Sequence, residues 1–393
     1  MVHDNEDTVF LPIRPNDNFA KSLSGRFGID DPDNIVKNEI YSNGEYCPTI
    51  KEDLDGRKAF VVYSYTKSSL NPTEAESRIL RMTDAAYRRR ASEVYLVMAE
   101  HLFDRQDLDP ALRYDDEFEN FSAGRKRKIA AMEGQPFSLR VAVKNFHGAG
   151  IKKVLTLDGH SPALYNEYQR IYRCNPKLVL FNLDPAPIFA SYLRSLKLNL
   201  GDSGDNVVFV APDKGSWEAV KRLHMLTSLP NASIVFCNKY RTTPNDPKGV
   251  EAAIEKTSEN FSGVEGRIII AQDDKGDTMG TLEKTIVRGL TRDGKPRQVH
   301  IFLSHMIFST RGAYELIEDN RLNVHGSNSH PAVAFKRGEP GFEQITVLDF
   351  TPYFAWAVVN HVKTGHPLPG IKDTSLYNSL FEVVKKGNII NFS

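Results

Sequence analysis

The sequence has little cysteine, no excess of charge of one sign and no long apolar run, and each shortage excludes a class of protein. Three cysteines occur in 393 residues, Cys47, Cys174 and Cys237, without the spacing of a zinc site or the density of a disulfide framework. Fifty Lys and Arg residues balance fifty Asp and Glu residues, so no overall basic field favours nucleic acid. We expect no nucleic-acid partner, and any bound anion must be held by local groups.

Membrane attachment and secretion are not expected either. No run of about 18 apolar residues occurs that would span a bilayer. The stretch MVHDNEDTVF lacks the basic region and apolar core of a secretion signal. We therefore expect a cytoplasmic protein with no membrane partner, whose length suits two domains of common size.

Short apolar runs rich in Val, Ile, Leu and Phe recur along the chain. The first is KAFVVYSY, which begins at residue 58, and the eighth is QVHIFLSH, which begins at residue 298. Their continuous hydrophobicity is typical of buried parallel strands. Amphipathic stretches lie between them, at 73–91 and 216–229 for example, so the alternation predicts an α/β fold. Prolines and a new strand divide the series near residues 175–190.

Polar or small residues follow five of these runs, in the segments HLFDRQD, LDGH, APDKGS, NKYR and QDDKGDTMGT. Ligands of open parallel sheets bind beyond the carboxyl ends of the strands, so these segments are the candidate site. The first of these segments, HLFDRQD, is followed by a long polar excursion at 107–135, which contains an acidic run and a basic run. Two interpretations of it stay open, a solvated surface insertion and a lid that faces the ligand.

The segment RIIIAQDDKGDTMGT, residues 267–281, predicts a sugar-phosphate site. We expect its strand to stop at Asp273 and Asp274 and its chain to turn through Gly276 and Gly280 into a helix. Unpaired backbone N–H groups of such a turn bind phosphate, and the Thr278 and Thr281 hydroxyls add donors. Carboxylates beside a phosphate would repel it unless they bind something else, such as a diol or Mg²⁺. A sugar phosphate supplies both a phosphate and a diol.

The segment DDKGDTMGT resembles the ribose-5-phosphate loop of the phosphoribosyltransferase fold. The remaining strand ends resemble, in order, those of the ribose-phosphate diphosphokinases, also called phosphoribosyl diphosphate synthetases. The resemblance begins at Val9 and extends over most of the chain. It implies two tandem phosphoribosyltransferase-like α/β domains, each a parallel sheet flanked by helices, at 8–178 and 179–349. Residues 351–365 are expected to form a helix that joins the first domain.

In the first domain the resemblance implies nucleotide-binding residues. YSNGEY resembles the family's turn that reaches the adenine of a neighbouring subunit's ATP, although Asn43 stands where Asp is usual. FDRQD resembles a segment that contacts ATP, and TLDGH resembles a strand end whose histidine binds the Mg²⁺ that carries the nucleotide. The implied residues are Tyr41, Asn43 and Glu45, then Arg105 and Gln106 for ATP, and His160 for Mg²⁺.

In the second domain the resemblance implies the residues of diphosphate transfer. VFVAPDKGSW resembles the diphosphate loop, with Asp213 as a second Mg²⁺ ligand, and FCNKYR resembles the start of the catalytic loop. Side chains two apart in an extended segment point to one side, so Lys239 and Arg241 can converge on one anion. Asp273 and Asp274 are implied to hold the ribose diol. The remaining implied residues are Lys214, Gly215 and Ser216 for diphosphate, and Asp277, Thr278, Met279, Gly280 and Thr281 for the 5-phosphate.

The implied reaction is transfer of the diphosphoryl group of Mg-ATP to the anomeric hydroxyl of a ribose phosphate, which releases AMP. Lys275, Gly276 and Met279 depart from the family's loop, so both ribose 5-phosphate and ADP-ribose, the acceptor of a branch encoded by bacterial viruses, are considered. A homo-oligomer, dimer or hexamer, is implied. Two other classes are a phosphoribosyltransferase and a non-catalytic associated subunit; the retained Lys239, Arg241 and His160 argue against the latter.

Overall fold

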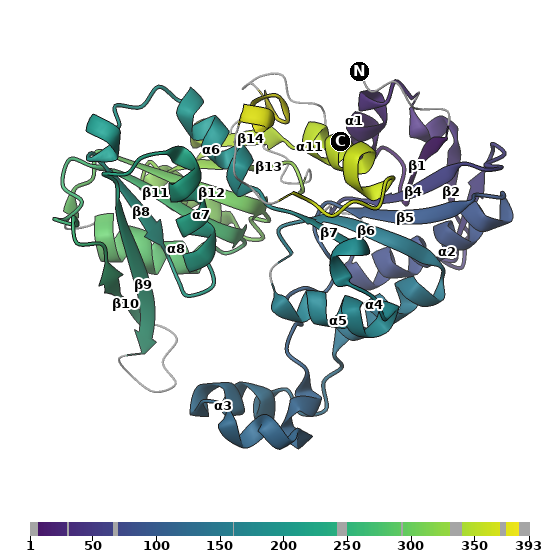
Figure 1. Cartoon of the computed structure of the whole chain (residues 1–393), viewed down its shortest axis with the longest axis horizontal. Coiled ribbons are helices and arrows are strands. Elements are labelled where there is room, and N and C mark those ends of the chain that lie inside the picture. Colours follow the sequence, from purple (N-terminus) through teal and green to yellow (C-terminus); the bar gives the residue numbers. More distant parts are fainter. Residues whose placement is uncertain are drawn as a thin grey trace. The chain divides into compact units, whose positions relative to one another are not determined.

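The computed structural model describes residues 7–29, 31–65, 70–159, 161–241, 250–291, 294–330, 340–369 and 375–384. The chain divides into two α/β units (Figure 1). The first contains residues 1–64, 69–183 and 357–368, and the second contains residues 65–68, 184–356 and 369–393. No helix among the described residues is long and apolar enough to cross a bilayer.

A parallel sheet forms the centre of the first unit; its described strands have the order β1-β4-β5-β6-β7. Large side chains such as Phe10, Phe60 and Tyr95 are fully buried in it, as continuous apolar runs predict. Helices α2, α4 and α5 cover one face, and α1 covers the other (Figure 1). The elements are β1 (Thr8–Pro12), β4 (Lys58–Tyr63), β5 (Glu93–Met98), β6 (Ile151–Leu157), β7 (Leu180–Leu183), α1 (Asn18–Arg26), α2 (Pro72–Arg88), α4 (Ser138–Gly148) and α5 (Pro162–Tyr172).

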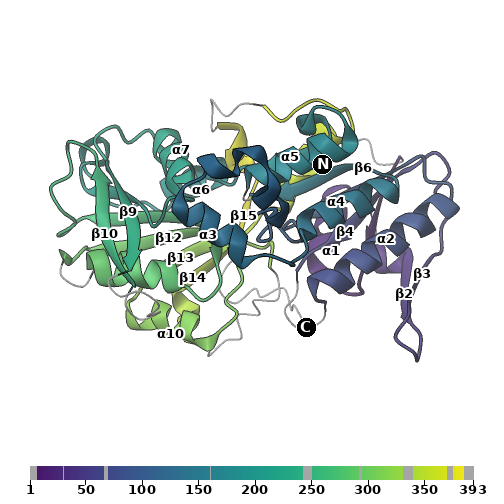
Figure 2. The same cartoon turned by 90° about the horizontal axis from the view of Figure 1, so that it is seen from below.

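A separate antiparallel hairpin, β2 (Val36–Ile40) and β3 (Tyr46–Ile50), lies beside α2, and its loop extends beyond that helix (Figure 2). The Arg78 guanidinium of α2 stacks 4.7 Å from the centre of the Tyr46 ring and attaches the hairpin. The excursion at 107–135 is a cluster of short elements: η2 (Pro110–Tyr114), η3 (Asp116–Asn120) and α3 (Ala123–Ala131).

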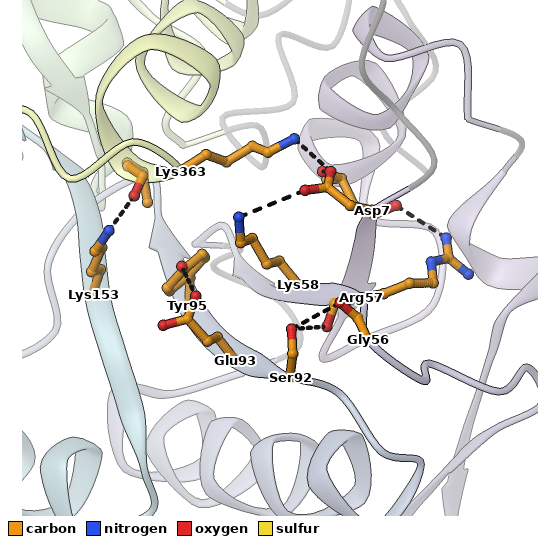
Figure 3. Close-up of polar contacts among 11 residues, drawn as sticks. Asp7, Gly56, Arg57, Lys58, Ser92, Glu93, Tyr95, Lys153 and Lys363 are labelled. Atoms are coloured by element: carbon orange, nitrogen blue, oxygen red, sulfur yellow. Dashed lines mark hydrogen bonds and ion pairs between the residues drawn. The ribbon is translucent and has the colours of Figure 1, made fainter.

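The segment 357–368 is fixed to the first sheet by lysines (Figure 3). Lys363 Nζ donates to Asp7 Oδ1 at 2.5 Å, and Lys58 Nζ lies 3.6 Å from Asp7 Oδ2. Lys153 Nζ, on β6, donates to the Val362 carbonyl at 2.5 Å. Burial acts to raise the pKa of Asp7, but the bonds from Lys363 and Thr8 and the lysine charges outweigh it and lower that pKa below its ordinary value.

The second unit contains a mixed sheet whose described strands have the order β10-β9-β8-β11-β12-β13-β14-β15, with only β10 and β15 antiparallel to their neighbours. Its strands are β8 (Val207–Ala211), β9 (Ser233–Arg241), β10 (Val250–Thr257), β11 (Ile268–Gly276), β12 (Gln298–Met306), β13 (Asn323–Ser327), β14 (Ile345–Asp349) and β15 (Glu382–Val384). Its helices are α6 (Ala186–Ser195), α7 (Trp217–Thr227), α8 (Gly280–Leu282), η6 (Glu283–Thr291) and α10 (Arg311–Asp319).

The two faces of the second sheet bury different cores. One face carries an aliphatic cluster that includes Val208, Ile269 and Leu303 and is covered by η6 and α10. The opposite face is aromatic, and Phe302 packs 5.2 Å from Phe189 of α6. His300 and His325 stack on this second face with ring centres 5.3 Å apart, and a 3.0 Å hydrogen bond joins His300 Nδ1 and His325 Nε2.

The eight apolar runs all form strands, which confirms the α/β prediction. The boundary between the units lies later than the predicted 178/179. Strand β7 pairs with β6 in the first sheet, so the first unit continues to Leu183. Pro176 begins a short turn, η4 (Pro176–Leu178), within the first unit, and the sequence analysis took the prolines here as the junction itself. The predicted helix 351–365 is observed as two consecutive elements, α11 (Thr351–Ala357) and η8 (Val358–Val362). The chain passes from the second unit into the first at Ala357.

The stacked histidines predict acid sensitivity. Burial lowers the pKa of His300 to about 4; burial and the neighbouring His300 lower that of His325 to about 3. The unfolded chain binds these protons near pH 6.5, so the stabilisation is intact above that pH and is lost as pH falls towards 4. The double variant His300→Leu/His325→Leu should reduce the slope of unfolding free energy against pH by up to about 2.7 kcal/mol per pH unit.

Urea unfolding followed between about pH 7 and 4 measures that slope. His147→Leu, at an exposed position of the first unit, is the control and should leave the slope near the wild-type value. An unchanged slope in the double variant would show that the stacked pair already takes up protons in the folded state.

Candidate active site

Three neighbouring strands bring the predicted segments of the second unit to one edge. Strand β8 pairs in parallel with β9 on one side and with β11 on the other. Their carboxyl ends therefore lie together, followed by the diphosphate loop 212–216, the residues after Arg241 and the loop 277–279. This is the edge at which open parallel sheets bind ligands.

Asp213 organises the diphosphate loop. Its Oδ1 atom accepts hydrogen bonds from the backbone N–H groups of Gly215 at 3.0 Å and Ser216 at 3.2 Å. The buried Ser216 hydroxyl donates to the Asp213 carbonyl at 2.9 Å and accepts from the Asp213 N–H at 3.2 Å. Lys214 and Gly215 are exposed. Two amide groups predicted to face an anion are thus directed at the Asp213 carboxylate in this conformation.

The two acids of the sugar-phosphate segment lie within β11 rather than after it. The strand continues to Gly276, because Lys275 and Gly276 pair with His305 and Met306 of β12. The expected strand end at Asp274 is therefore two residues too early, since polar residues at the edge of a parallel sheet still form its backbone ladder.

Asp273 is 8% exposed, so its carboxylate is largely withdrawn from water. Burial raises the pKa of Asp273 well above its ordinary value, and the charges of Asp274 and Asp213 raise it further. The Asp273 carboxylate on β11 is thus close enough to those of Asp274, on the same strand, and Asp213, in the diphosphate loop, to be repelled by both. Oxygen donors in this arrangement suit a hard divalent cation such as Mg²⁺, or the hydroxyls of a diol, either of which would offset the repulsion.

The sugar-phosphate loop directs Met279 inward. Met279 has a left-handed backbone with φ of 60° and is 3% exposed, in the same aliphatic cluster as Leu303 and Phe308. Its side chain therefore packs in the core, and the assignment of Met279 to the 5-phosphate stays a prediction for its backbone. Thr278 is exposed, and its hydroxyl accepts a 3.5 Å hydrogen bond from the Gly280 N–H. Asp277 and Thr281 are half-buried.

The two glycines of this loop serve different purposes. A Cβ atom at Gly276 would lie 2.4 Å from Leu303 Cδ1 and 3.1 Å from Phe308 Cε1. A Cβ atom at Gly280 would meet nothing closer than Thr278 Oγ1, at 3.5 Å. Gly276 is required for packing, whereas the surroundings of Gly280 are open enough for a ligand to approach its backbone.

The cationic segment is described only in its backbone. Lys239 and Arg241 lie in β9, opposite Ala252 and Val250 of β10. Residues two apart in a strand share a face, as predicted. The side chains of both residues, and the segment 242–249, lie outside the described residues.

In the first unit, the predicted nucleotide segments follow the adjacent strands β5 and β6. Arg105 and Gln106 are exposed after β5, and the Gln106 N–H donates to the Phe103 carbonyl at 3.0 Å. His160 lies outside the described residues. The preceding Gly159 exchanges two hydrogen bonds with the Asn182 side chain, at 2.7 and 3.1 Å, which holds this strand end in place.

The hairpin turn of the first unit presents Tyr41, Asn43 and Glu45 to solvent. Asn43 Oδ1 accepts a 3.1 Å hydrogen bond from the Glu45 N–H, and the Tyr41 N–H donates to the Glu45 carbonyl at 2.9 Å. Asn and Asp side chains both support turns in this way. The departure at Asn43 therefore preserves the shape of the turn.

Sequence reasoning missed one buried polar group at the site edge. His305 pairs in register with Lys275, is fully buried, and its Nδ1 atom lies 2.8 Å from the Ser329 hydroxyl oxygen. The segment QVHIFLSH was interpreted only as a strand. Its signal was available, because this run too ends in polar residues, Ser304 and His305.

Comparison with known proteins gives relatives over most of the chain, although no protein-family profile matches it. It is 26% identical over 340 residues to the ribose-phosphate pyrophosphokinase of Clostridium acetobutylicum, which covers 86% of this chain and 89% of that protein. It is 25% identical over 337 residues to ribose-phosphate pyrophosphokinase 1 of Listeria innocua, covering 85% and 89%. The chain is a divergent homologue of the ribose-phosphate pyrophosphokinases.

A solved structure shows that the fold is shared as well. The phosphoribosylpyrophosphate synthetase of Mycobacterium smegmatis superposes with a TM-score of 0.67 and 19% identity, covering 90% of this chain and 99% of that one. The predicted fold is thereby confirmed, and the resemblance to the ribose-phosphate diphosphokinases inferred from the strand ends is matched by relatives at 25–26% identity. The individual site residues stay predictions.

The unequal roles of the glycines can be tested by matched substitutions. Gly276→Ala should destabilise the protein by about 1–3 kcal/mol, because the new methyl group must displace Leu303 and Phe308. Gly280→Ala is the control and should change unfolding free energy by less than about 0.5 kcal/mol. Denaturant unfolding measures the unfolding free energy of both variants. Equal losses of unfolding free energy would contradict the packing role assigned to Gly276.

The carboxylate repulsion predicts a gain in stability on neutralisation. Asp273→Asn should raise the melting temperature of the ligand-free protein at neutral pH, since it removes a buried charge that faces Asp274 and Asp213. The gain should shrink at low pH, where wild-type Asp273 takes up its own proton. Calorimetry beside the exposed control Asp319→Asn measures both effects. A lowered melting temperature at neutral pH would contradict the repulsion.

Proposed function

We propose that the chain transfers the diphosphoryl group of ATP to the anomeric hydroxyl of a ribose 5-phosphate moiety and releases AMP. The observation that carries the proposal is the convergence of Asp213, in the loop after β8, with Asp273 and Asp274 of β11 at one sheet edge. Its support outside the structure is the similarity to ribose-phosphate pyrophosphokinases over most of the chain.

The proposed roles follow the order of the strands. Asp273 and Asp274 hold the ribose diol, and the backbone and hydroxyls of 277–281 hold the 5-phosphate. The diphosphate loop and Asp213 hold the diphosphate. Asp213 in the second unit, and His160 in the first by the resemblance, are each proposed as a ligand of Mg²⁺, which when bound neutralises phosphate charge. To admit a diphosphate oxygen at the Gly215 and Ser216 amides, the Asp213 carboxylate has to turn away from them.

Lys239 and Arg241 are proposed to stabilise the moving diphosphoryl group. Transfer between oxygens spreads negative charge over the equatorial oxygens of the phosphorus, and fixed cations there lower the barrier. The anomeric hydroxyl is the nucleophile, so no side chain needs to form a covalent intermediate. Arg105 and Gln106 are proposed to position the nucleotide.

The proposed enzyme is a homo-oligomer. The hairpin turn carries two exposed apolar side chains, Ile40 at 54% and Tyr41 at 48% exposure, which suit contact with a neighbouring subunit. Through this turn Tyr41, Asn43 and Glu45 are proposed to reach the adenine of the ATP bound by that neighbour. A dimer is the smallest assembly that satisfies this arrangement.

The acceptor is either ribose 5-phosphate or ADP-ribose, both of which carry the ribose 5-phosphate moiety. Met279 and Gly276 pack against the core, so these two departures from the family's loop do not enlarge its phosphate end. The other two departures from the family are Lys275, which is half-buried, and the excursion 107–135. Both place polar or charged side chains at least partly in contact with solvent.

AMP release from Mg-ATP, with each acceptor offered separately, tests the proposal. AMP should form with one acceptor, and Lys239→Ala should reduce the rate by about 10²–10³-fold, because it removes a cation from the transferring group. Lys221→Ala, a cation on α7 away from the loops, is the matched control and should retain the wild-type rate. Absence of AMP with both acceptors despite ATP binding would favour the non-catalytic subunit.

A further inference from the structure

The excursion between Asp109 and Gln135 is ordered by local contacts, although it buries almost nothing of its own. Its short elements are capped by Asp109, Asp115 and Ser122, whose side chains accept from backbone N–H groups at 2.9, 2.9 and 3.3 Å. In the described part of this segment, Ile129 is the only side chain buried from solvent. A segment with so small a core has little to offset the entropy lost on ordering.

Both ends of the excursion are attached to the body of the first unit. Arg140 of α4 pairs with Asp109, where the excursion begins, and with the buried Glu167 of α5 through bonds of 2.9 and 3.1 Å. Phe137, just after its end, is 9% exposed under the Arg140 guanidinium. Figure 1 shows the α3 cluster beyond α4 and α5, joined to them by two connections. The segment 109–135 is thus a projection that is attached to the first unit at both ends.

The projection carries two patches of opposite charge. The acidic patch is Asp115, Asp116 and Glu117, and the basic patch is Arg125, Arg127 and Lys128. All six side chains are exposed, and none of them forms an ion pair with another described residue. The only pairs inside the projection join Arg113 to Glu133 and Lys126 to Glu119. Arg125 stacks 4.0 Å from the centre of the Phe121 ring and Asp115 Oδ1 caps η3, but no ion pair among the described residues neutralises the charge of either patch.

We propose that this projection docks on the same projection of a second copy of the chain. In a contact with two-fold symmetry, the acidic patch of each copy lies on the basic patch of the other, so one surface supplies both halves of the complementarity. The segment 109–135 contains five Lys or Arg residues and six Asp or Glu residues, so its near-neutral charge does not favour a polyanion. Tyr114, 79% exposed, adds an aromatic anchor of the kind enriched at interfaces.

Charge reversal tests this contact in the full chain and does not depend on catalysis. Two triple variants are made, Arg125→Glu/Arg127→Glu/Lys128→Glu and Asp115→Lys/Asp116→Lys/Glu117→Lys. Each alone places like charges across the two-fold contact, so one association step should weaken by at least about tenfold in sedimentation velocity at low salt. An equimolar mixture of the two variants should regain it, because the patches are again complementary.

The control is Lys144→Glu/Lys152→Glu/Lys177→Glu, which makes the same charge change as the first triple variant at exposed positions of the first unit and should associate like the wild type. Circular dichroism verifies that every variant is folded. Identical sedimentation of the wild type and both triple variants, or failure of the mixture to recover, would overturn the proposal. It is equally overturned if the wild-type step requires added single-stranded RNA, which would make the basic patch a polyanion site.

Discussion

The parallel pairing of β8 between β9 and β11 is the constraint on which the candidate site depends. It forces three loops that are distant in sequence to leave the sheet at one edge, whatever their own conformations. The buried Phe209 and Ile270, paired in register, hold β8 and β11 together through the core, so the positions of the loops follow from packing far from the chemistry. Loss of that core would separate the acids from the diphosphate loop.

The same constraint produces the repulsion among Asp213, Asp273 and Asp274. An apolar core could not tolerate such a group, and a protein selected only for stability would replace it. The ligands proposed for these carboxylates, a cation or a diol, would interact with them and relieve the repulsion. The free energy that destabilises the ligand-free edge becomes available for binding, which is how a site gains affinity for a ligand that matches its charge.

The sequence was sufficient for the order of elements and for the general place of the site, because apolar runs and polar strand ends are local signals. It did not reveal that β11 continues through Asp273 and Asp274, since strand pairing with β12 depends on partners distant in the chain. It also assigned β7 to the wrong side of the boundary, because a proline can begin a turn inside a unit as readily as a linker. Ser304 and His305 at the end of QVHIFLSH carry the same signal as the five candidate strand ends, but the sequence alone does not show that His305 is buried there.

Met279 shows why a departure from a motif is not evidence of altered specificity until its direction is known. In the sequence, Met279 lies in the middle of the predicted phosphate loop. In the structure, its side chain packs in the core with Leu303. Met279 has a left-handed backbone, and its side chain is buried. A large residue can therefore replace a small one without narrowing or widening the phosphate end.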